Sequence, residues 1–219
     1  MNFVQQGRPG RFLTEGVLHL LILNGLVHIS VMLFGGFVVR EPFGDNLFEK
    51  LGSFFPGTVP FKPWQVITHM FTHGDNIHLM FNMFALWMFG IVLENKWGRN
   101  RFLFFYITCG LGAYILHMLV IYLQAKGSAP QTFVVGASGA IYGLLLAFAY
   151  LFPNQKLIFL LFPVPIKAKY FVAILLVVEF YLGLQRFDWD FFAHFAHLGG
   201  ALTGLVLVWL WQRNRKQFY

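Results

Sequence analysis

Long apolar stretches that contain no Asp, Glu, Lys or Arg constrain the fold of this chain more than any other feature. A helix needs about 20 apolar residues to cross a bilayer, with a range of about 17–25. The uncharged stretches are residues 17–39, 77–93, 102–123, 132–152 and 191–212. A sixth and weaker stretch, 168–184, contains Glu179 and follows two prolines. We therefore predict six membrane-spanning helices.

The composition agrees with this prediction. Only 11% of the residues are charged and 58% are hydrophobic, whereas about 25% of the residues of soluble domains are charged. With the N-terminus inside, most of the 16 Lys and Arg residues fall on the cytoplasmic side, as the positive-inside rule requires. We expect an all-α polytopic membrane protein, a six-transmembrane-helix bundle with both termini cytoplasmic and one domain over residues 1–219. The single cysteine, Cys109, excludes an internal disulfide.

The longest connection, residues 40–68, has an unusual composition for a loop. It is rich in Phe, Pro and Gly and contains Trp64. Aromatic side chains favour the interface between lipid and water. We therefore predict a structured loop that lies on the outer membrane surface.

A serine among glycines marks the start of the fourth predicted helix. Near a helix start, Ser138 would lie close to free backbone N–H groups and to the positive end of the helix dipole, a place that suits an oxyanion. Gly139 and Gly143 form a GxxxG pair, which lets another helix approach closely. Tyr142 follows Ser138 by one turn and shares its face. Taken alone, this pattern favours a packing motif with an incidental serine.

The last predicted helix changes that balance. His197 is followed on the same helical face by Gly200 and Gly204. These glycines would let the face pack against the fourth helix, which would bring His197 to the Ser138 hydroxyl. His194 has no such glycine stripe below it.

A third polar cluster lies at the head of the second predicted helix. His69 and His73 are spaced i, i+4, and so are His78 and Asn82. A zinc site is the alternative here, but the H-E-x-x-H pattern is absent and no acid stands beside the histidines as a general base. His78 and Asn82 are better interpreted as oxyanion donors or as hydrogen bonders between helices.

Taken together, these residues resemble the rhomboid intramembrane serine proteases over about residues 64–204. The motifs occur in the family's order, on the second, fourth and sixth helices. They are an H-x4-H-x3-N run at His73, His78 and Asn82, a G-x-S-G run at Gly136 to Gly139 and an H-x-x-G-x-x-x-G run at His197 to Gly204. The stretch LENKWG, with Glu94, is similar to the family's cytoplasmic loop.

The resemblance implies a serine endopeptidase that cleaves transmembrane segments through an acyl-enzyme. Ser138 would be the nucleophile and His197 the general base. His78, Asn82 and the backbone N–H of Ser138 would stabilise the oxyanion. The supporting residues would be Tyr142, which stacks on the base, Gly136, which permits the turn before the serine, and Gly139, His73, Gly200 and Gly204.

The sequence places no acid to orient His197, so catalysis would use a Ser–His dyad. Glu179 is interpreted as a hydrogen bonder between helices, with a proton relay as the alternative. The family often has Trp-Arg in the outer loop, where this chain has Trp64 and Gln65. This departure bears on how the loop is anchored.

The expected partners are single-pass or polytopic membrane-protein substrates and the lipid bilayer, with no nucleic acid, no metal and no cofactor. The fifth helix would gate substrate access, and the segment LQRFDWDFFAH would cap the site. Short loops and the absence of a transit peptide predict a bacterial cytoplasmic (inner) membrane, with the active site facing the outer side. Two other classes remain as alternatives: a non-catalytic rhomboid-like protein that binds membrane helices, and a small transporter that uses Glu179 and the histidines as a proton path.

Overall fold

The computed structural model describes residues 13–37, 39, 46–125, 132–158, 164–185 and 193–215. Within these residues, five helices are long and apolar enough to cross a membrane. They are α1 (Glu15–Phe34), α4 (Asn76–Trp97), α5 (Arg99–Gln124), α7 (Ala168–Gln185) and α8 (His194–Arg215). The fold is thus the expected polytopic helical bundle, whereas the six-span count and the side of the termini stay predictions.

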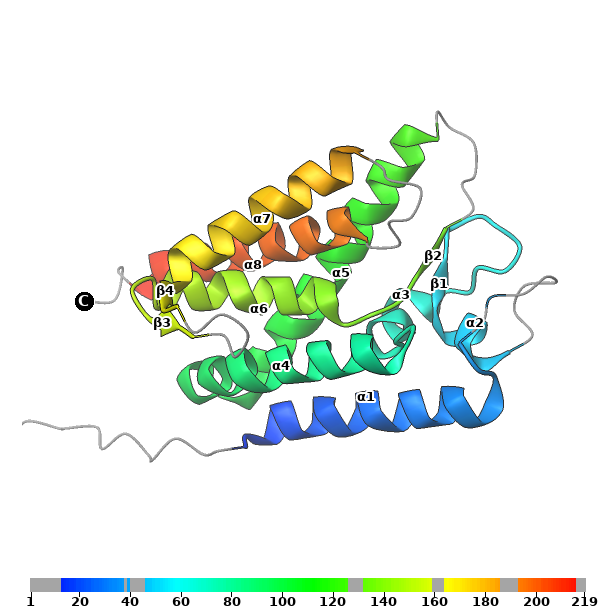
Figure 1. Cartoon of the computed structure of the whole chain (residues 1–219), viewed down its shortest axis with the longest axis horizontal. Helices are drawn as coiled ribbons and strands as arrows, with labels where there is room; N and C mark the ends of the chain where they lie inside the picture. Colours follow the sequence, from blue (N-terminus) through cyan, green and yellow to red (C-terminus); the bar gives the residue numbers. More distant parts are fainter. Residues whose placement is uncertain are drawn as a thin grey trace, which may run out of the picture.

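The remaining long helix, α6 (Ser138–Leu151), has 14 residues and lies at the centre of the bundle (Figure 1). It packs against α4, α5, α7 and α8, and most of its residues are buried. At about 1.5 Å per residue it spans roughly 21 Å, which is less than the hydrocarbon core of about 30 Å. The neighbouring helices therefore surround a helix that is too short to cross the hydrocarbon core of a bilayer by itself.

The helix predicted over 132–152 begins later than the apolar run suggested. Phe133 and Val134 form a short strand, β2 (Phe133–Val134), which pairs antiparallel with β1 (Ser53–Phe54). Gly136 then takes a φ of +122°, a conformation that L side chains rarely adopt and that ends any continuous helix. As a result, Ser138 is the first residue of α6.

The connection between α1 and α4 is folded over its described part. It contains α2 (Leu47–Leu51), α3 (Gln65–Thr68) and the 3-10 helix η1 (His69–Phe71). A second two-stranded ladder, β3 (Lys156–Leu157) with β4 (Ile166–Lys167), lies elsewhere and follows α6. Gln65 is buried and anchors this connection. Its Nε2 donates to the Glu49 carbonyl at 3.0 Å, and its Oε1 accepts from the backbone N–H groups of Lys62 at 3.0 Å and Phe54 at 3.4 Å. Gln65, which stands where the resemblance leads one to expect arginine, therefore holds the described part of the loop through these hydrogen bonds.

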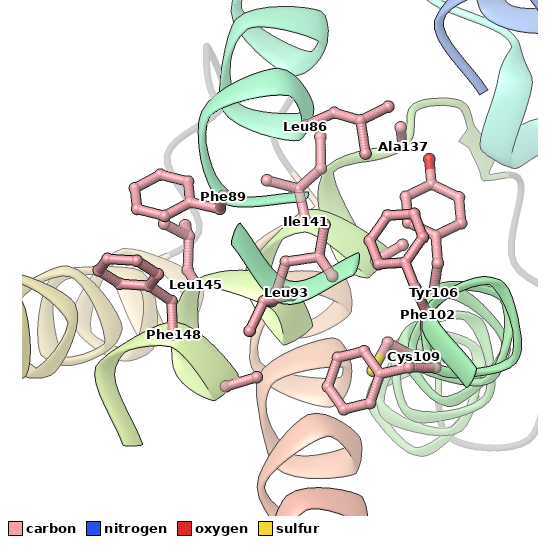
Figure 2. Close-up of a cluster of buried hydrophobic side chains, with 14 of the residues drawn as sticks. Leu86, Phe89, Leu93, Phe102, Tyr106, Cys109, Ala137, Ile141, Leu145 and Phe148 are labelled. Carbon is pink, nitrogen blue, oxygen red and sulfur yellow. The ribbon is translucent and has the colours of Figure 1, made fainter. Parts of the chain in front are cut away.

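A cluster of apolar side chains surrounds the first turns of α6 (Figure 2). The members labelled in Figure 2 come from three helices and the residue before α6. The labelled members are Leu86, Phe89 and Leu93 from α4, Phe102, Tyr106 and Cys109 from α5, and Ile141, Leu145 and Phe148 from α6 with Ala137 just before it. This packing fixes the position of the helix that begins with Ser138.

Glycines bring the backbones of α6 and α8 into direct contact. A Cβ added at Gly200 would overlap the carbonyl oxygen of Gly139, and a Cβ added at Gly204 would lie 2.9 Å from the Cα of Gly143. Small residues allow such close approach of membrane helices. The glycine stripes of the two helices therefore face each other.

Glu94, near the end of α4, holds the start of α1. Its carboxylate accepts hydrogen bonds from the Thr14 hydroxyl at 2.5 Å and from the backbone N–H groups of Gly16 at 2.7 Å and Val17 at 2.8 Å. The first N–H groups of a helix have no partner within the helix. A buried carboxylate from a neighbouring helix supplies one here.

Candidate active site

Ser138 and His197 meet where α6 and α8 are in closest contact. His197 Nε2 lies 2.8 Å from Ser138 Oγ. The histidine is 7% exposed. Gly200 lies one turn beyond His197 and touches Gly139, the residue after the serine. The glycine contact therefore sets the distance between hydroxyl and imidazole.

Tyr142 covers one face of the His197 ring. The two rings are stacked with centroids 4.2 Å apart and an angle of 4° between their planes. Tyr142 is one turn after Ser138 on α6, so serine and tyrosine hold the imidazole from the same helix. The ring is thereby restricted to the plane in which Nε2 reaches Oγ.

The expectation that no acid faces the base is wrong. Glu179 on α7 is buried, and its Oε2 lies 2.9 Å from His197 Nδ1, the ring nitrogen opposite the serine. The distance is that of a hydrogen bond, but the direction of the Nδ1–H group does not meet hydrogen-bond geometry. The contact is therefore a close polar pair.

Two further groups hold the same carboxylate. The Tyr142 hydroxyl donates to Glu179 Oε1, and His194 Nδ1 lies 2.5 Å from Glu179 Oε2. His194, which lacks a glycine stripe, thus belongs to the cluster through Glu179. The expected role of Glu179 as a hydrogen bonder between helices agrees with these contacts, which join α7 to α6 and α8.

His78 flanks the space beside the serine. A Cβ added at Gly136 would lie 2.8 Å from His78 Nε2 and 3.7 Å from Ser138 Oγ. The imidazole and the hydroxyl therefore border the same small space. Asn82, one turn further along α4, is buried and donates from Nδ2 to the His78 carbonyl at 2.8 Å, which leaves a second N–H on that nitrogen.

The histidines before α4 have structural contacts. The His69 carbonyl accepts from the Gly136 backbone N–H at 2.9 Å and so holds the turn that precedes Ser138. His73 is fully buried and packs edge-on against the His78 ring, with centroids 5.0 Å apart. Burial lowers the pKa of His69 to about 4 and that of His73 to about 3. Both rings are therefore neutral at neutral pH.

A metal ion could be held by a set of residues other than the one considered from the sequence. Within the described residues, Glu179, His194 and His197 each offer a ligand atom, and these atoms lie within 4.8 Å of one another. Imidazole nitrogens and a carboxylate oxygen are suitable zinc ligands. The same atoms are, however, already in polar contact with each other at 2.5 and 2.9 Å, so the cluster does not require an ion.

Part of the predicted cap lies outside the described residues. The segment LQRFDWDFFAH runs from Leu184 to His194, and residues 186–192 are not described. His194, the last residue of that segment, is described as the first residue of α8, and its contact with Glu179 is therefore known.

Comparison with known proteins identifies the family. Residues 60–214 match the Rhomboid domain, which covers more than half of the chain. The chain belongs to the rhomboid family.

Curated relatives share about a third of the aligned residues. The chain is 33% identical to "Rhomboid protein 1, mitochondrial" of Saccharomyces cerevisiae over 66% of its length and 40% of that protein. It is 34% identical to "RHOMBOID-like protein 6, mitochondrial" of Arabidopsis thaliana over 67% of its length and 43% of that protein. It is 32% identical to "Presenilin-associated rhomboid-like protein A, mitochondrial" of Danio rerio over 65% of its length and 36% of that protein. The chain thus matches about two-fifths of the length of these relatives.

These relatives correct the expected location. The short loops predicted a bacterial cytoplasmic (inner) membrane, but the relatives from yeast, plant and fish are all named as mitochondrial. These names overturn the expected bacterial location. Loop length reflects the compactness of the bundle and does not identify the membrane.

Proposed function

We propose that this protein is an intramembrane serine endopeptidase that cleaves transmembrane segments of membrane-protein substrates. The observation that carries the proposal is the 2.8 Å contact between Ser138 Oγ and His197 Nε2 at the start of a buried helix. An activated serine needs a base within about 2.6–3.2 Å. Membership of the rhomboid family supports the same activity.

In this mechanism His197 takes the proton of the Ser138 hydroxyl while Oγ attacks a peptide carbonyl. The tetrahedral intermediate collapses to an acyl-enzyme as His197 returns the proton to the leaving amine. A water molecule, activated by the same imidazole, then hydrolyses the ester. Each step needs His197 to exchange one proton at Nε2, and no cofactor takes part.

The developing oxyanion needs donors on the side of the serine that faces His78. The backbone N–H of Ser138, at the first position of α6, has no intrahelical acceptor and is free to donate. The His78 ring flanks this space, and Asn82 has an N–H left over on the same helix. We assign these three groups to the oxyanion hole.

Replacing Asn82 by alanine is expected to lower kcat by about 10²–10³-fold, the usual effect of losing one oxyanion donor. Steady-state cleavage of a transmembrane substrate in detergent micelles would measure this loss. Covalent labelling of Ser138 by a fluorophosphonate should persist in the variant, because Ser138 and His197 remain in contact. An unchanged kcat would remove Asn82 from the mechanism.

Substrates would be membrane segments that unwind locally, because the carbonyl groups of an intact helix are already hydrogen-bonded. We assign α7 as the element that moves to admit them. Only 22% of its apolar window is buried, against 44% for α5 and for α8. It is therefore the helix whose displacement disturbs the least packing.

The decisive experiment is labelling of the purified protein with a fluorescent fluorophosphonate, with Ser138→Ala and His197→Ala in parallel. The wild type should label, Ser138→Ala should not label at all, and His197→Ala should label far more slowly. EDTA should leave the wild-type rate unchanged, since the serine and histidine act without a metal. A folded wild-type protein that does not label would support instead a non-catalytic protein that binds membrane helices.

A further inference from the structure

A buried carboxylate behind the histidine base has no part in the two-residue mechanism described above. Glu179 is 7% exposed, and its two oxygens contact groups from α6 and α8. A charged side chain within a membrane helix is costly and usually functional. Its role can be read from the three groups that it contacts.

The Glu179 carboxylate lies at Nδ1 of His197, the ring nitrogen that faces away from the serine. His197 Nε2 faces Ser138 Oγ, and Nδ1 faces Glu179 Oε2 at 2.9 Å. For Nε2 to accept the serine proton, the neutral ring must carry its own proton on Nδ1. A carboxylate at Nδ1 favours this tautomer and stabilises the imidazolium that forms during attack. Catalytic hydrogen bonds are often poorly aligned without substrate and tighten later.

The other two contacts hold the carboxylate in place. A carboxylate can accept about four hydrogen bonds, so the Tyr142 hydroxyl and His194 Nδ1 leave room for His197. Tyr142 acts twice, since it donates to Oε1 and stacks on the His197 ring at 4.2 Å. The base and the carboxylate are thus aligned with each other by the same aromatic side chain.

We propose that Glu179 is a positioning residue that orients and polarises His197, so that the site works as a Ser138–His197–Glu179 triad whose carboxylate is held by Tyr142 and His194. The inference rests on the protease function proposed above. During attack the Oγ–H proton moves to Nε2, the Oγ–C bond forms, and the Nδ1 proton stays on the imidazolium beside the carboxylate. Glu179 itself touches no substrate.

The test compares Glu179→Gln with Glu94→Gln. Both wild-type side chains are buried carboxylates in membrane helices, but Glu94 contacts the start of α1 and has no described contact with the site. Glu179→Gln should lower kcat by about 10²–10⁴-fold with KM unchanged, as expected when the acid of a triad is neutralised. Glu94→Gln should lower the melting temperature with a near wild-type kcat for the folded fraction. His194→Phe, which keeps a ring but removes the donor, should lower kcat by about tenfold.

A second measurement uses the wild-type protein alone. The ¹⁵N shifts of labelled histidine distinguish a ring protonated on Nδ1 from one protonated on Nε2, and the signal of His197 is identified by its loss in His197→Gln. The Nδ1–H tautomer is expected. If Glu179→Gln does not fold, the Nδ1 proton of His197 decides the question: a strongly downfield signal is expected for an N–H that donates to a carboxylate, and a signal at the usual imidazole position would overturn the role of Glu179.

The outcomes separate the two proposals. A wild type that neither labels nor cleaves overturns the protease function. A wild type that labels and cleaves, together with a folded Glu179→Gln of wild-type kcat, overturns only the role of Glu179. An Nε2–H tautomer of His197 in the active wild type would also overturn the role of Glu179.

Discussion

Replacing Gly200 by alanine is expected to lower the rate of proteolysis by about 10²-fold or more and to destabilise the bundle. The new methyl group would overlap the backbone carbonyl of Gly139, which cannot move aside as a flexible side chain can. Overpacking of this kind costs about 1–3 kcal/mol. Because Gly200 is one turn after His197, the resulting separation of α6 and α8 moves the base away from Ser138. A displacement of about 1 Å is enough to lower the rate by about 10²-fold.

The matched control for this substitution is Gly25→Ala. Gly25 is also a helical glycine in a membrane-spanning helix, but a Cβ there would meet nothing within 4 Å. Alanine is the better helix former by about 0.5–1 kcal/mol. The control should therefore melt at or above the wild-type temperature and retain activity. Melting curves and fluorophosphonate labelling of both variants make the comparison, and a Gly200→Ala that labels at the wild-type rate would contradict the proposed backbone contact.

Replacing Gly136 by alanine is expected to remove activity for a different reason. At a φ of +122° an alanine is strained. Its Cβ would also lie 2.8 Å from His78 Nε2 and 3.7 Å from Ser138 Oγ, within the space assigned to the oxyanion. The variant should fold with reduced stability and lose at least about 10²-fold in kcat, as for an oxyanion donor.

Gly57→Ala separates strain from obstruction. Gly57 has a φ of +93°, and a Cβ at that position would meet nothing within 4 Å. Both variants should lose stability through strain, while only Gly136→Ala should lose kcat. Equal loss of kcat in the two variants would show that general destabilisation, and not the filled space, is responsible.

Features encoded by nearby residues could be predicted from the sequence. The stripes Gly139–Gly143 and Gly200–Gly204 are spaced by helical turns, so periodicity predicted a small-residue face on each helix, and the structure shows these faces in contact. The same reasoning placed Tyr142 on the face of Ser138. Spacing along one helix is a local property, and it carried over directly to the three-dimensional site.

Features that depend on distant segments could not be predicted in this way. The apolar run before Ser138 has the composition of a helix, but Phe133 and Val134 pair with residues near position 53, so the helix starts later. Glu179 has no charged partner within its own helix. Only the packing of α7 on α6 and α8 reveals that its carboxylate meets Tyr142, His194 and His197.

The position of Glu179 on α7 links substrate admission to the readiness of the base. If α7 swings away to admit a polypeptide, it takes the carboxylate with it and leaves Tyr142, His194 and His197 without their shared acceptor. Each buried donor that loses its partner costs about 1–3 kcal/mol. If the proposed function and gate hold, these contacts would keep the resting protein closed, and an open protein would be a weak hydrolase until α7 returns. Such coupling between α7 and His197 would protect membrane proteins that are not substrates from cleavage when α7 opens briefly.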